Sequence, residues 1–251
     1  MHGYDAKVSK GARESSVVYL GLVISFAGLV LLIWPVGRLG VGTRPDALLV
    51  LAGGLTVALI GLILPASDST ARRSESRLDE FVPRWQFSEH HAITVPAPPD
   101  RVFEAIRQVR ANEIALFGAF TWIRRGGRDI GECVLNAGSR KPILDVALSS
   151  GFTLLADDGP REVVIGLAPT EGAFAAMNFA VRPDGAKGSI VTTETRIFAG
   201  SPAAKRRFGA YWRLIYPGSA LLRRTWLRAI RNRALQRTQS RPEPVPPAAG
   251  A

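Results

Sequence analysis

Two long apolar runs near the N-terminus decide how this chain is organised: VVYLGLVISFAGLVLLIW at residues 17–34 and ALLVLAGGLTVALIGLIL at residues 47–64. They lie inside uncharged stretches of 23 residues (15–37) and 21 residues (47–67). A bilayer core ~30 Å thick needs about 20 apolar residues in a helix, and backbone groups in lipid must bond within that helix. The sequence therefore predicts two transmembrane helices, joined as an antiparallel hairpin by the short loop at residues 37–46.

Each apolar run contains a row of small residues at helical spacing. The rows are Gly21, Ser25 and Gly28 in the first run, and Gly54, Ala58 and Gly61 in the second. Small residues on one helix face let two backbones approach closely. We expect the hairpin to pack on itself through these faces. The alternative is a homo-oligomer in which the same faces pack against another copy of the chain.

Lysine and arginine residues around the two runs predict the orientation, because such residues favour the cytoplasmic side of a membrane. The two flanks of the hairpin carry more of them than the loop does. The flanking residues are Lys7, Lys10, Arg13, Arg72, Arg73, Arg77 and Arg84, and the loop residues are Arg38 and Arg44. We therefore expect a multi-pass protein of the cell (inner or plasma) membrane with both termini in the cytoplasm. A cleaved signal peptide is the alternative, but the first run is long and has no AxA-like site.

The net charge of +11 is a local feature. Residues 201–241 hold 11 basic residues and no acidic one, whereas the rest of the chain holds 21 of each sign. An anionic membrane surface is the expected partner, since each basic residue close to it contributes ~1 kcal/mol. A solvated face and a nucleic-acid surface are the alternatives, the latter without a recognised nucleic-acid-binding fold. The candidate contact residues are Arg223, Arg224, Arg228 and Arg231.

The residues after the second apolar run have the patterns of one soluble domain. The polar residues 68–85 are expected to form a linker. SEHHAITV (88–95) predicts a strand, and PAPPDRVFEAIRQV (96–109) predicts a helix, because prolines are tolerated at a helix start. A second helix is expected over residues 112–123, followed by loop with at most one short strand over 124–150.

The second half of the domain has clearer periodicity. Four strand patterns follow one another, namely GFTLLAD (151–157), REVVIGL (161–167), FAAMNFAV (174–181) and SIVTTETRIFA (189–199). The turn sequences DDGP and RPDGAKG between them predict an antiparallel meander. The chain then has a helical pattern over 202–236, interrupted at the Tyr-Pro-Gly of 216–218. A proline-rich tail (237–251) is expected to be disordered.

This order of elements predicts an α+β domain over residues 86–236, behind a tail (1–14) and the hairpin (15–67). The string ITVPAPPDRVFEAI (93–106), the meander and the closing helix resemble the START-like, or SRPBCC, superfamily, which includes polyketide cyclase-like proteins and has the helix-grip fold. The resemblance implies an antiparallel sheet wrapped on a long C-terminal helix. It also implies a cavity between them that binds a hydrophobic or lipid-like ligand.

Few residues carry a recognisable chemistry. GxSxG, HExxH and P-loop motifs are absent, and the single cysteine, Cys133, allows no disulfide within the chain. We expect neither a metal nor a cofactor, and no catalytic residue is assigned. The candidates for lining the cavity are His91, Asn178, Glu194, Arg196 and Trp212.

Each of these candidates also has a purely structural interpretation. His91 shares a strand face with Ile93 and Val95, but it could instead bond to backbone or water. Glu194 and Arg196 share a face of one strand, where an ion pair on the surface would contribute little. Trp212 and its aromatic neighbours follow helical spacing, which is typical of core residues.

The function predicted from the sequence is a membrane-anchored binding protein for a hydrophobic or lipid-like small molecule. The basic C-terminal helix would hold the domain near the cytoplasmic leaflet. A second hypothesis is a polyketide cyclase-like enzyme with acid–base help from His91, Glu194 or Arg196. A third is an interaction module that binds no ligand, because side chains fill its cavity.

Overall fold

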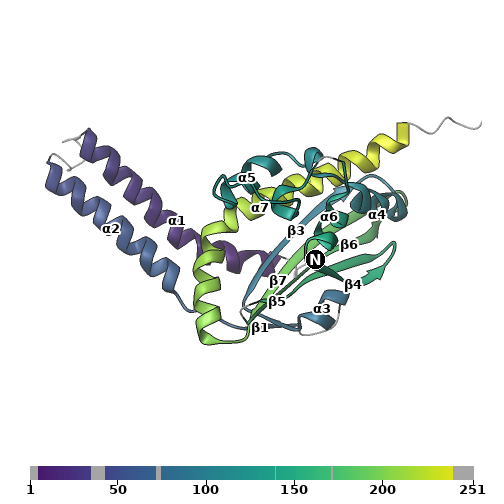
Figure 1. Cartoon of the computed structure of the whole chain (residues 1–251), viewed down its shortest axis with the longest axis horizontal. Coiled ribbons are helices and arrows are strands. Elements are labelled where there is room, and N and C mark those ends of the chain that lie inside the picture. The colour runs from purple at the N-terminus through teal and green to yellow at the C-terminus, as the bar shows by residue number, and fades with distance from the viewer. Residues whose placement is uncertain (1–4, 35–42, 72–74, 139, 171, 240–251) are drawn as a thin grey trace, which may run out of the picture. The chain divides into compact units, whose positions relative to one another are not determined.

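A computed structural model describes residues 5–34, 43–71, 75–138, 140–170 and 172–239 (Figure 1). Most of the hairpin loop, the first four residues of the N-terminal tail and most of the C-terminal tail lie outside these residues. The described residues form two compact units. The first unit comprises the described residues within 1–91, 166–177 and 194–221, and the second comprises those within 92–165, 178–193 and 222–239.

The two apolar runs form two long helices, α1 (Asp5–Ile33) and α2 (Arg44–Ile63). Helix α2 begins with a capping box, in which Thr43 and Asp46 bond to each other's backbone N–H groups. This cap explains why α2 starts three residues before the apolar run. Both predicted apolar helices are therefore present.

The hairpin packs on itself through the predicted small residues. A Cβ atom built on Gly21 would lie 2.3 Å from the backbone nitrogen of Ala58, and one on Gly54 would lie 2.4 Å from that of Ser25. The corresponding distances are 2.5 Å from Gly28 to the backbone nitrogen of Leu51 and 2.9 Å from Gly61 to that of Val18. At these separations only glycine fits, so the predicted packing faces are confirmed.

The segment predicted to be a linker contains regular structure. Strands β1 (Ser69–Thr70) and β2 (Arg84–Trp85) pair antiparallel and flank the short helix α3 (Arg77–Phe81). Leu78 of α3 is fully buried, as is most of Trp85. The residues between the apolar helices and the sheet therefore contribute side chains to the buried core.

The domain contains a five-stranded antiparallel sheet with the strand order β3-β7-β6-β5-β4. Its strands are β3 (Phe87–Val95), β4 (Phe152–Asp158), β5 (Glu162–Thr170), β6 (Ala173–Asp184) and β7 (Gly188–Ala199). Strands β4 to β7 form the predicted meander, and β3 pairs with β7. Gly185, in the turn between β6 and β7, has a φ of +67°, which glycine adopts without strain.

The region between β3 and β4 is helical, which corrects two expectations. The helix expected over 112–123 is divided into η2 (Ala111–Glu113) and α5 (Phe117–Arg124), because Leu116 adopts a left-handed conformation. Among the described residues of 124–150 there is no strand. Instead they form η3 (Val134–Asn136) and α6 (Ile143–Ser149). The apolar residues of α6 are buried at helical spacing. Helix α4 (Pro99–Gln108) follows β3 as predicted.

The C-terminal helix α7 (Pro202–Gln239) runs through the Tyr-Pro-Gly sequence, so the predicted interruption at 216–218 is wrong. A proline inside a helix removes one backbone hydrogen bond. Burial on both sides of Pro217 offsets this loss, since Trp212, Tyr216 and Ala220 are all buried.

Helix α7 packs on the sheet in each unit. In the first unit Trp212, Tyr216 and Ala220 form a cluster with Phe87 of β3 and Ile197 of β7. In the second, the rings of Phe179 of β6 and Trp226 of α7 lie 5.1 Å apart. An antiparallel sheet that wraps a long C-terminal helix is the helix-grip arrangement, and the predicted α+β fold class is confirmed.

Candidate functional site

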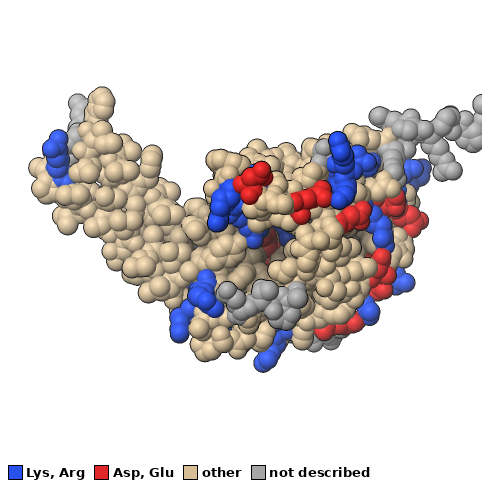
Figure 2. All heavy atoms as spheres, in the orientation of Figure 1, with Lys and Arg blue, Asp and Glu red and all other residues tan. Residues whose placement is uncertain are grey.

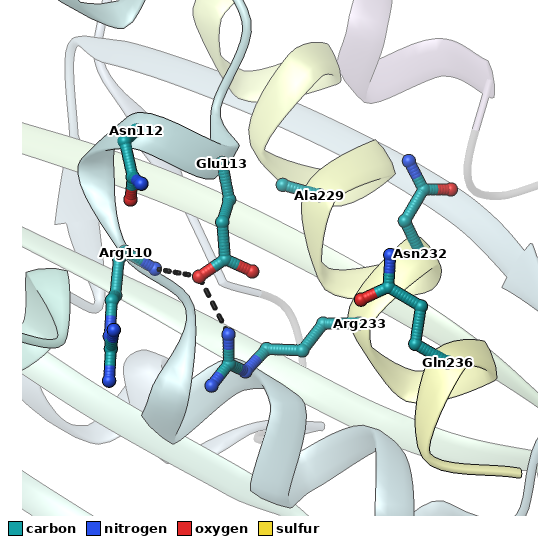
Figure 3. Close-up of a pocket in the computed structure, with 7 residues that line it drawn as sticks. All are labelled: Arg110, Asn112, Glu113, Ala229, Asn232, Arg233 and Gln236. Carbon is teal, nitrogen blue, oxygen red and sulfur yellow. Dashed lines mark hydrogen bonds and ion pairs between the residues drawn. The ribbon is translucent and has the colours of Figure 1, made fainter. Parts of the chain in front are cut away.

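A polar pocket of about 410 Å³ lies in the second unit, between η2 and the last turns of α7 (Figure 3). Helix η2 and the residue before it form one wall, and α7 forms the other. The lining residues are Arg110, Asn112, Glu113, Ala229, Asn232, Arg233 and Gln236. Six of these seven side chains are polar or charged, so the pocket is suited to a polar group rather than to an apolar chain.

One carboxylate and one guanidinium meet across this pocket. Arg233 extends from α7 toward η2 and donates to Glu113 over 2.6 Å (Figure 3). The same carboxylate oxygen accepts from the backbone N–H of Arg110, at 3.1 Å. The pair neutralises itself and leaves the positive charge of Arg110, whose residue is exposed, in excess at the pocket.

Two kinds of N–H group at this pocket could donate hydrogen bonds to a ligand. The Nε–H of Arg233 is buried and has no hydrogen-bond partner among the described residues. The carboxamides of Asn112 and Asn232 belong to opposite walls (Figure 3). Guanidinium and amide N–H groups together recognise an anion that also carries hydroxyl groups. This is the ligand chemistry that the pocket supports.

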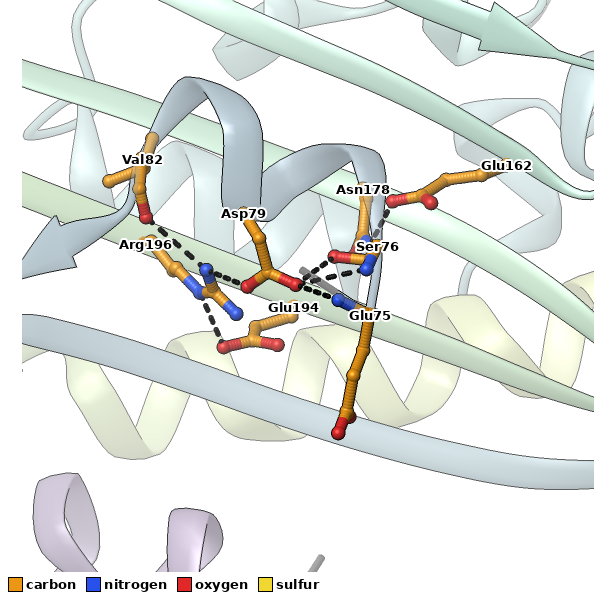
Figure 4. A network of polar contacts seen from close by, with 8 residues as sticks. All are labelled: Glu75, Ser76, Asp79, Val82, Glu162, Asn178, Glu194 and Arg196. Atoms are coloured by element: carbon orange, nitrogen blue, oxygen red, sulfur yellow. Dashed lines mark hydrogen bonds and ion pairs between the residues drawn. The ribbon is translucent and has the colours of Figure 1, made fainter. Parts of the chain in front are cut away.

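A second polar constellation lies under α3 in the first unit, where Arg196 of β7 bonds to two carboxylates (Figure 4). Its Nη1 lies 2.6 Å from Oδ1 of Asp79, and its Nε lies 2.7 Å from Oε1 of Glu194. Nη1 also donates to the backbone oxygen of Val82, at 3.2 Å. The guanidinium carbon lies 4.0 Å from the centre of the Trp85 ring, and only 1% of the Arg196 side chain is exposed.

The pKa values of this network follow from its geometry. Burial alone would raise the pKa of Asp79, but the hydrogen bond from Arg196 and those from the backbone of Glu75 and Ser76 hold it below its ordinary value. Burial alone would lower the pKa of Arg196, but the bonds to Glu194 and Asp79 raise it. Asp79 and Arg196 are therefore charged and paired, which fixes α3 on β7.

The first unit also buries a carboxylate between a histidine and a serine. The Nε2 atom of His91 lies 2.9 Å from Oε1 of Glu89, and the hydroxyl of Ser219 on α7 donates to Oε2 over 2.7 Å. His91 is buried and lies next to Glu89, so it is not bonded only to backbone or water. The serine hydroxyl donates to the carboxylate and not to the histidine, so it lacks the paired base that activates a serine nucleophile.

The structure does not gather the five cavity candidates into one group. Trp212 lies in the aromatic cluster of the first unit and His91 is bonded to Glu89, both on the side of α7. Glu194 and Arg196 bond beneath α3, so their ion pair is buried rather than on the surface. Asn178 donates to Glu162 over 2.7 Å and points away from α7, since its neighbour Phe179 packs on that helix. A ligand-binding role for these residues stays a prediction.

The arginines predicted to contact a membrane surface lie along the second half of α7. Arg224, Arg228 and Arg231 are exposed, and their spacing places them on one face. Within the part of the chain that the structure describes, these three form no ion pair. Arg223 is half-buried and lies over the ring of Trp226, at 5.4 Å.

The pocket residues were missed from the sequence, for an identifiable reason. Glu113 and Arg233 are 120 positions apart, and no local pattern links them. The available signal was Asn232 and Gln236, two amide residues spaced four apart in a helix otherwise rich in arginine. Their spacing indicates one polar face without showing what it meets.

The chain matches no family model and no curated protein sequence. Among solved structures, a protein from Deinococcus radiodurans is 15% identical with a TM-score of 0.33, over 60% of this chain and 99% of that one. A norcoclaurine synthase from Thalictrum is 13% identical with a TM-score of 0.34, over 61% and 96%. An aromatase/cyclase from a Streptomyces is 13% identical with a TM-score of 0.26, over 61% and 96%. Similarity at this level concerns the fold alone.

Proposed function

We propose that this protein is anchored in a membrane by α1 and α2, and that its helix-grip domain binds an amphipathic, lipid-like molecule by its polar headgroup. The observation that carries the proposal is the division of the hairpin surface. The two helices approach each other at glycine, serine and alanine, with Val17, Val18 and Leu51 beside these residues. Most of their other leucine, isoleucine, valine and phenylalanine side chains are exposed.

The dimensions and exposure of the hairpin support a membrane anchor. The apolar segments Ser15–Ile33 and Arg44–Ile63 have 19 and 20 residues and mean hydropathies of 2.5 and 2.2. Only 22% of each segment is buried, whereas the core helix of a soluble protein would be mostly buried. Figure 2 shows the hairpin almost free of charged side chains, with a basic group at its tip. Water is a poor solvent for such a surface and lipid is a good one.

The flanking charges support an orientation with both termini in the cytoplasm, at the cell membrane. In this orientation the domain is tethered beside the leaflet that carries anionic lipids. The exposed arginines Arg224, Arg228 and Arg231 would then bind their headgroups. Because the small-residue faces are already used within the hairpin, a homo-oligomer through the same faces would compete with it.

The chemistry of the pocket supports an anionic headgroup with hydroxyl groups as the ligand. An anion would pair with Arg110 and with the unused Nε–H of Arg233, and hydroxyl groups would bond to the amides of Asn112 and Asn232. A wholly apolar ligand would offer these groups no partner, and it would leave the buried Nε–H of Arg233 unsatisfied.

Two measurements on the full chain test the proposal. Extraction of membranes with alkaline carbonate should leave the protein in the pellet, and complete release would contradict the anchor. Native mass spectrometry of the detergent-solubilised protein should show an adduct with phosphatidylglycerol and not with phosphatidylcholine. The variant Arg110→Gln should weaken this adduct, whereas the exposed control Arg140→Gln should not. Equal adducts with both lipids in all three proteins would contradict headgroup binding by the polar pocket between η2 and α7, which we call the headgroup pocket.

A second candidate function is an interaction module without a ligand. The observation that favours it is the filled space between sheet and helix in the first unit, where Phe87, Phe208, Trp212 and Tyr216 pack ring against ring. This packing leaves the headgroup pocket in the second unit unaffected. Absence of any adduct in the experiment above would favour this candidate.

A further inference from the structure

The short helix α5 exposes an apolar surface that its own unit does not use. Leu116, Trp122 and Ile123 are 53%, 54% and 65% exposed. The opposite side of the helix is anchored, because Phe117 and Thr121 are buried. We call the three exposed residues the α5 surface.

The backbone around α5 is shaped to present this surface. Leu116 has a φ of +64°, and it is the only residue other than glycine with a positive φ among the described residues. A bulky residue is strained in this conformation, and such backbone strain is concentrated at functional sites. After the helix, Gly126 and Gly127 have φ values of +65° and +70°.

The turn formed by these glycines supports the tryptophan. A Cβ atom on Gly127 would lie 3.1 Å from the indole ring of Trp122, so a side chain at position 127 would crowd the ring. The indole is therefore held against the backbone on one side while half of it remains in solvent. The Trp122 ring therefore has a fixed position although half of it is exposed.

The charges next to the α5 surface favour an anionic partner. Arg124, Arg125 and Arg128 follow it directly, and the nearest acidic residues in the sequence are Glu113 and Asp129. Tryptophan beside arginine is typical of the interface between lipid headgroups and acyl chains, where the ring and the cation both find partners. Tryptophan and arginine are also common at protein interfaces, so a protein partner is the alternative outcome of the test. The membrane anchor proposed above favours the bilayer, because it places the domain beside anionic lipids.

We propose that the α5 surface inserts into the headgroup region of an anionic membrane, as a second membrane contact besides the hairpin. This proposal rests on the membrane anchor proposed above. It also gives the polar pocket a location, because η2 forms one wall of that pocket, contacts α5 and is joined to it by residues 114–116. Insertion of α5 would bring the pocket to the level of the headgroups that it binds.

The test uses the full chain with a fluorescent label on a single cysteine. In a Cys133→Ser background, Ile123→Cys is labelled with a polarity-sensitive dye and the protein is reconstituted with nitroxide-labelled lipids. Emission from position 123 should shift to shorter wavelength and be quenched in bilayers of phosphatidylglycerol and phosphatidylcholine. The shift should be smaller in phosphatidylcholine alone. The matched control is Leu154→Cys, a similarly exposed apolar position (45%) on β4 of the same unit, which should show neither change.

A third label, on Leu29→Cys in α1, separates the two proposals. Quenching at position 29 without quenching at 123 would overturn the α5 contact and leave the anchor standing. No quenching at position 29 would overturn the anchor, and the α5 contact with it. A blue shift at position 123 in detergent that grows with protein concentration would show that a second copy covers the surface, which would also overturn the proposal.

A second measurement avoids the cysteine substitutions. Brominated lipids quench tryptophan, and the unlabelled parent should lose more fluorescence in anionic bilayers than the variant Trp122→Phe does. Equal losses in the two proteins would contradict insertion of Trp122.

Discussion

Two arginines that bond to carboxylates have opposite surroundings in this molecule. Arg196 is 1% exposed, bonds to Asp79, Glu194 and a backbone oxygen, and lies over the Trp85 ring (Figure 4). Arg233 is 21% exposed, lines an open pocket, bonds to one carboxylate and has a buried Nε–H without a partner among the described residues (Figure 3). The difference separates a complete network, which holds structure together, from an incomplete one, which can accept a ligand.

The largest effect is expected from Arg196→Met. This change leaves two carboxylates buried beneath α3 without their counter-ion, and removal of one partner from a buried ion pair costs about 3–5 kcal/mol. Denaturant unfolding of the detergent-solubilised full chain, followed by tryptophan fluorescence, measures the loss. The exposed Arg140→Met is the control and should change the midpoint little. Equal midpoints for the two variants would mean that the network does not hold α3 on β7.

Acid should weaken the same network at a defined point. The pKa of Asp79 is lower in the folded protein than its ordinary value of 3.8. Its contribution to stability is therefore complete above about pH 4 and is lost as the pH falls through the folded-state pKa. The stability advantage of the parent over Asp79→Asn should be constant near neutrality and shrink below pH 4. The exposed Asp184→Asn serves as the control, and an Asp79 advantage that persists to the lowest pH would contradict the pairing.

The sequence predicted those elements whose pattern is local. The meander strands alternate and are separated by short turns, so β4 to β7 lie within three residues of their expected bounds at every end. The glycine rows of the hairpin likewise identified the faces that touch. Helix α6 was not predicted because its apolar run is only seven residues long and is preceded by Pro142, which made the segment resemble loop.

The polar contacts could not be predicted, because their partners are distant in the sequence. Arg196 and Asp79 are 117 positions apart, and Asp79 belongs to a segment that was expected to be a linker. Strand β7 is buried on both faces, so its alternation did not indicate which side faced α7. The spacing of Glu194 and Arg196 correctly placed them together but did not show that α3 covers them.

Loss of Arg233 from the pocket should destabilise the protein far less than loss of Arg196 from the buried network. Arg233→Gln removes a partly exposed ion pair, which contributes about 0–1 kcal/mol, so the unfolding midpoint should move little. The same change should weaken phosphatidylglycerol binding about tenfold, the equivalent of ~1.4 kcal/mol. Native mass spectrometry at several lipid concentrations measures the affinity. A large loss of stability with unchanged binding would reverse the roles assigned to the two arginines.

The smallest effect, and the most specific, is expected from Glu113→Gln. This change removes the negative charge that competes for Arg233, and it keeps an oxygen that can accept from the backbone N–H of Arg110. An anionic headgroup should therefore bind about fivefold more tightly, since unit charges about 4 Å apart in water interact by about 1 kcal/mol. The gain should fall as salt increases, because screening weakens contacts between exposed charges. In titrations at low and high salt, weaker binding than the parent would mean that Glu113 itself bonds to the ligand.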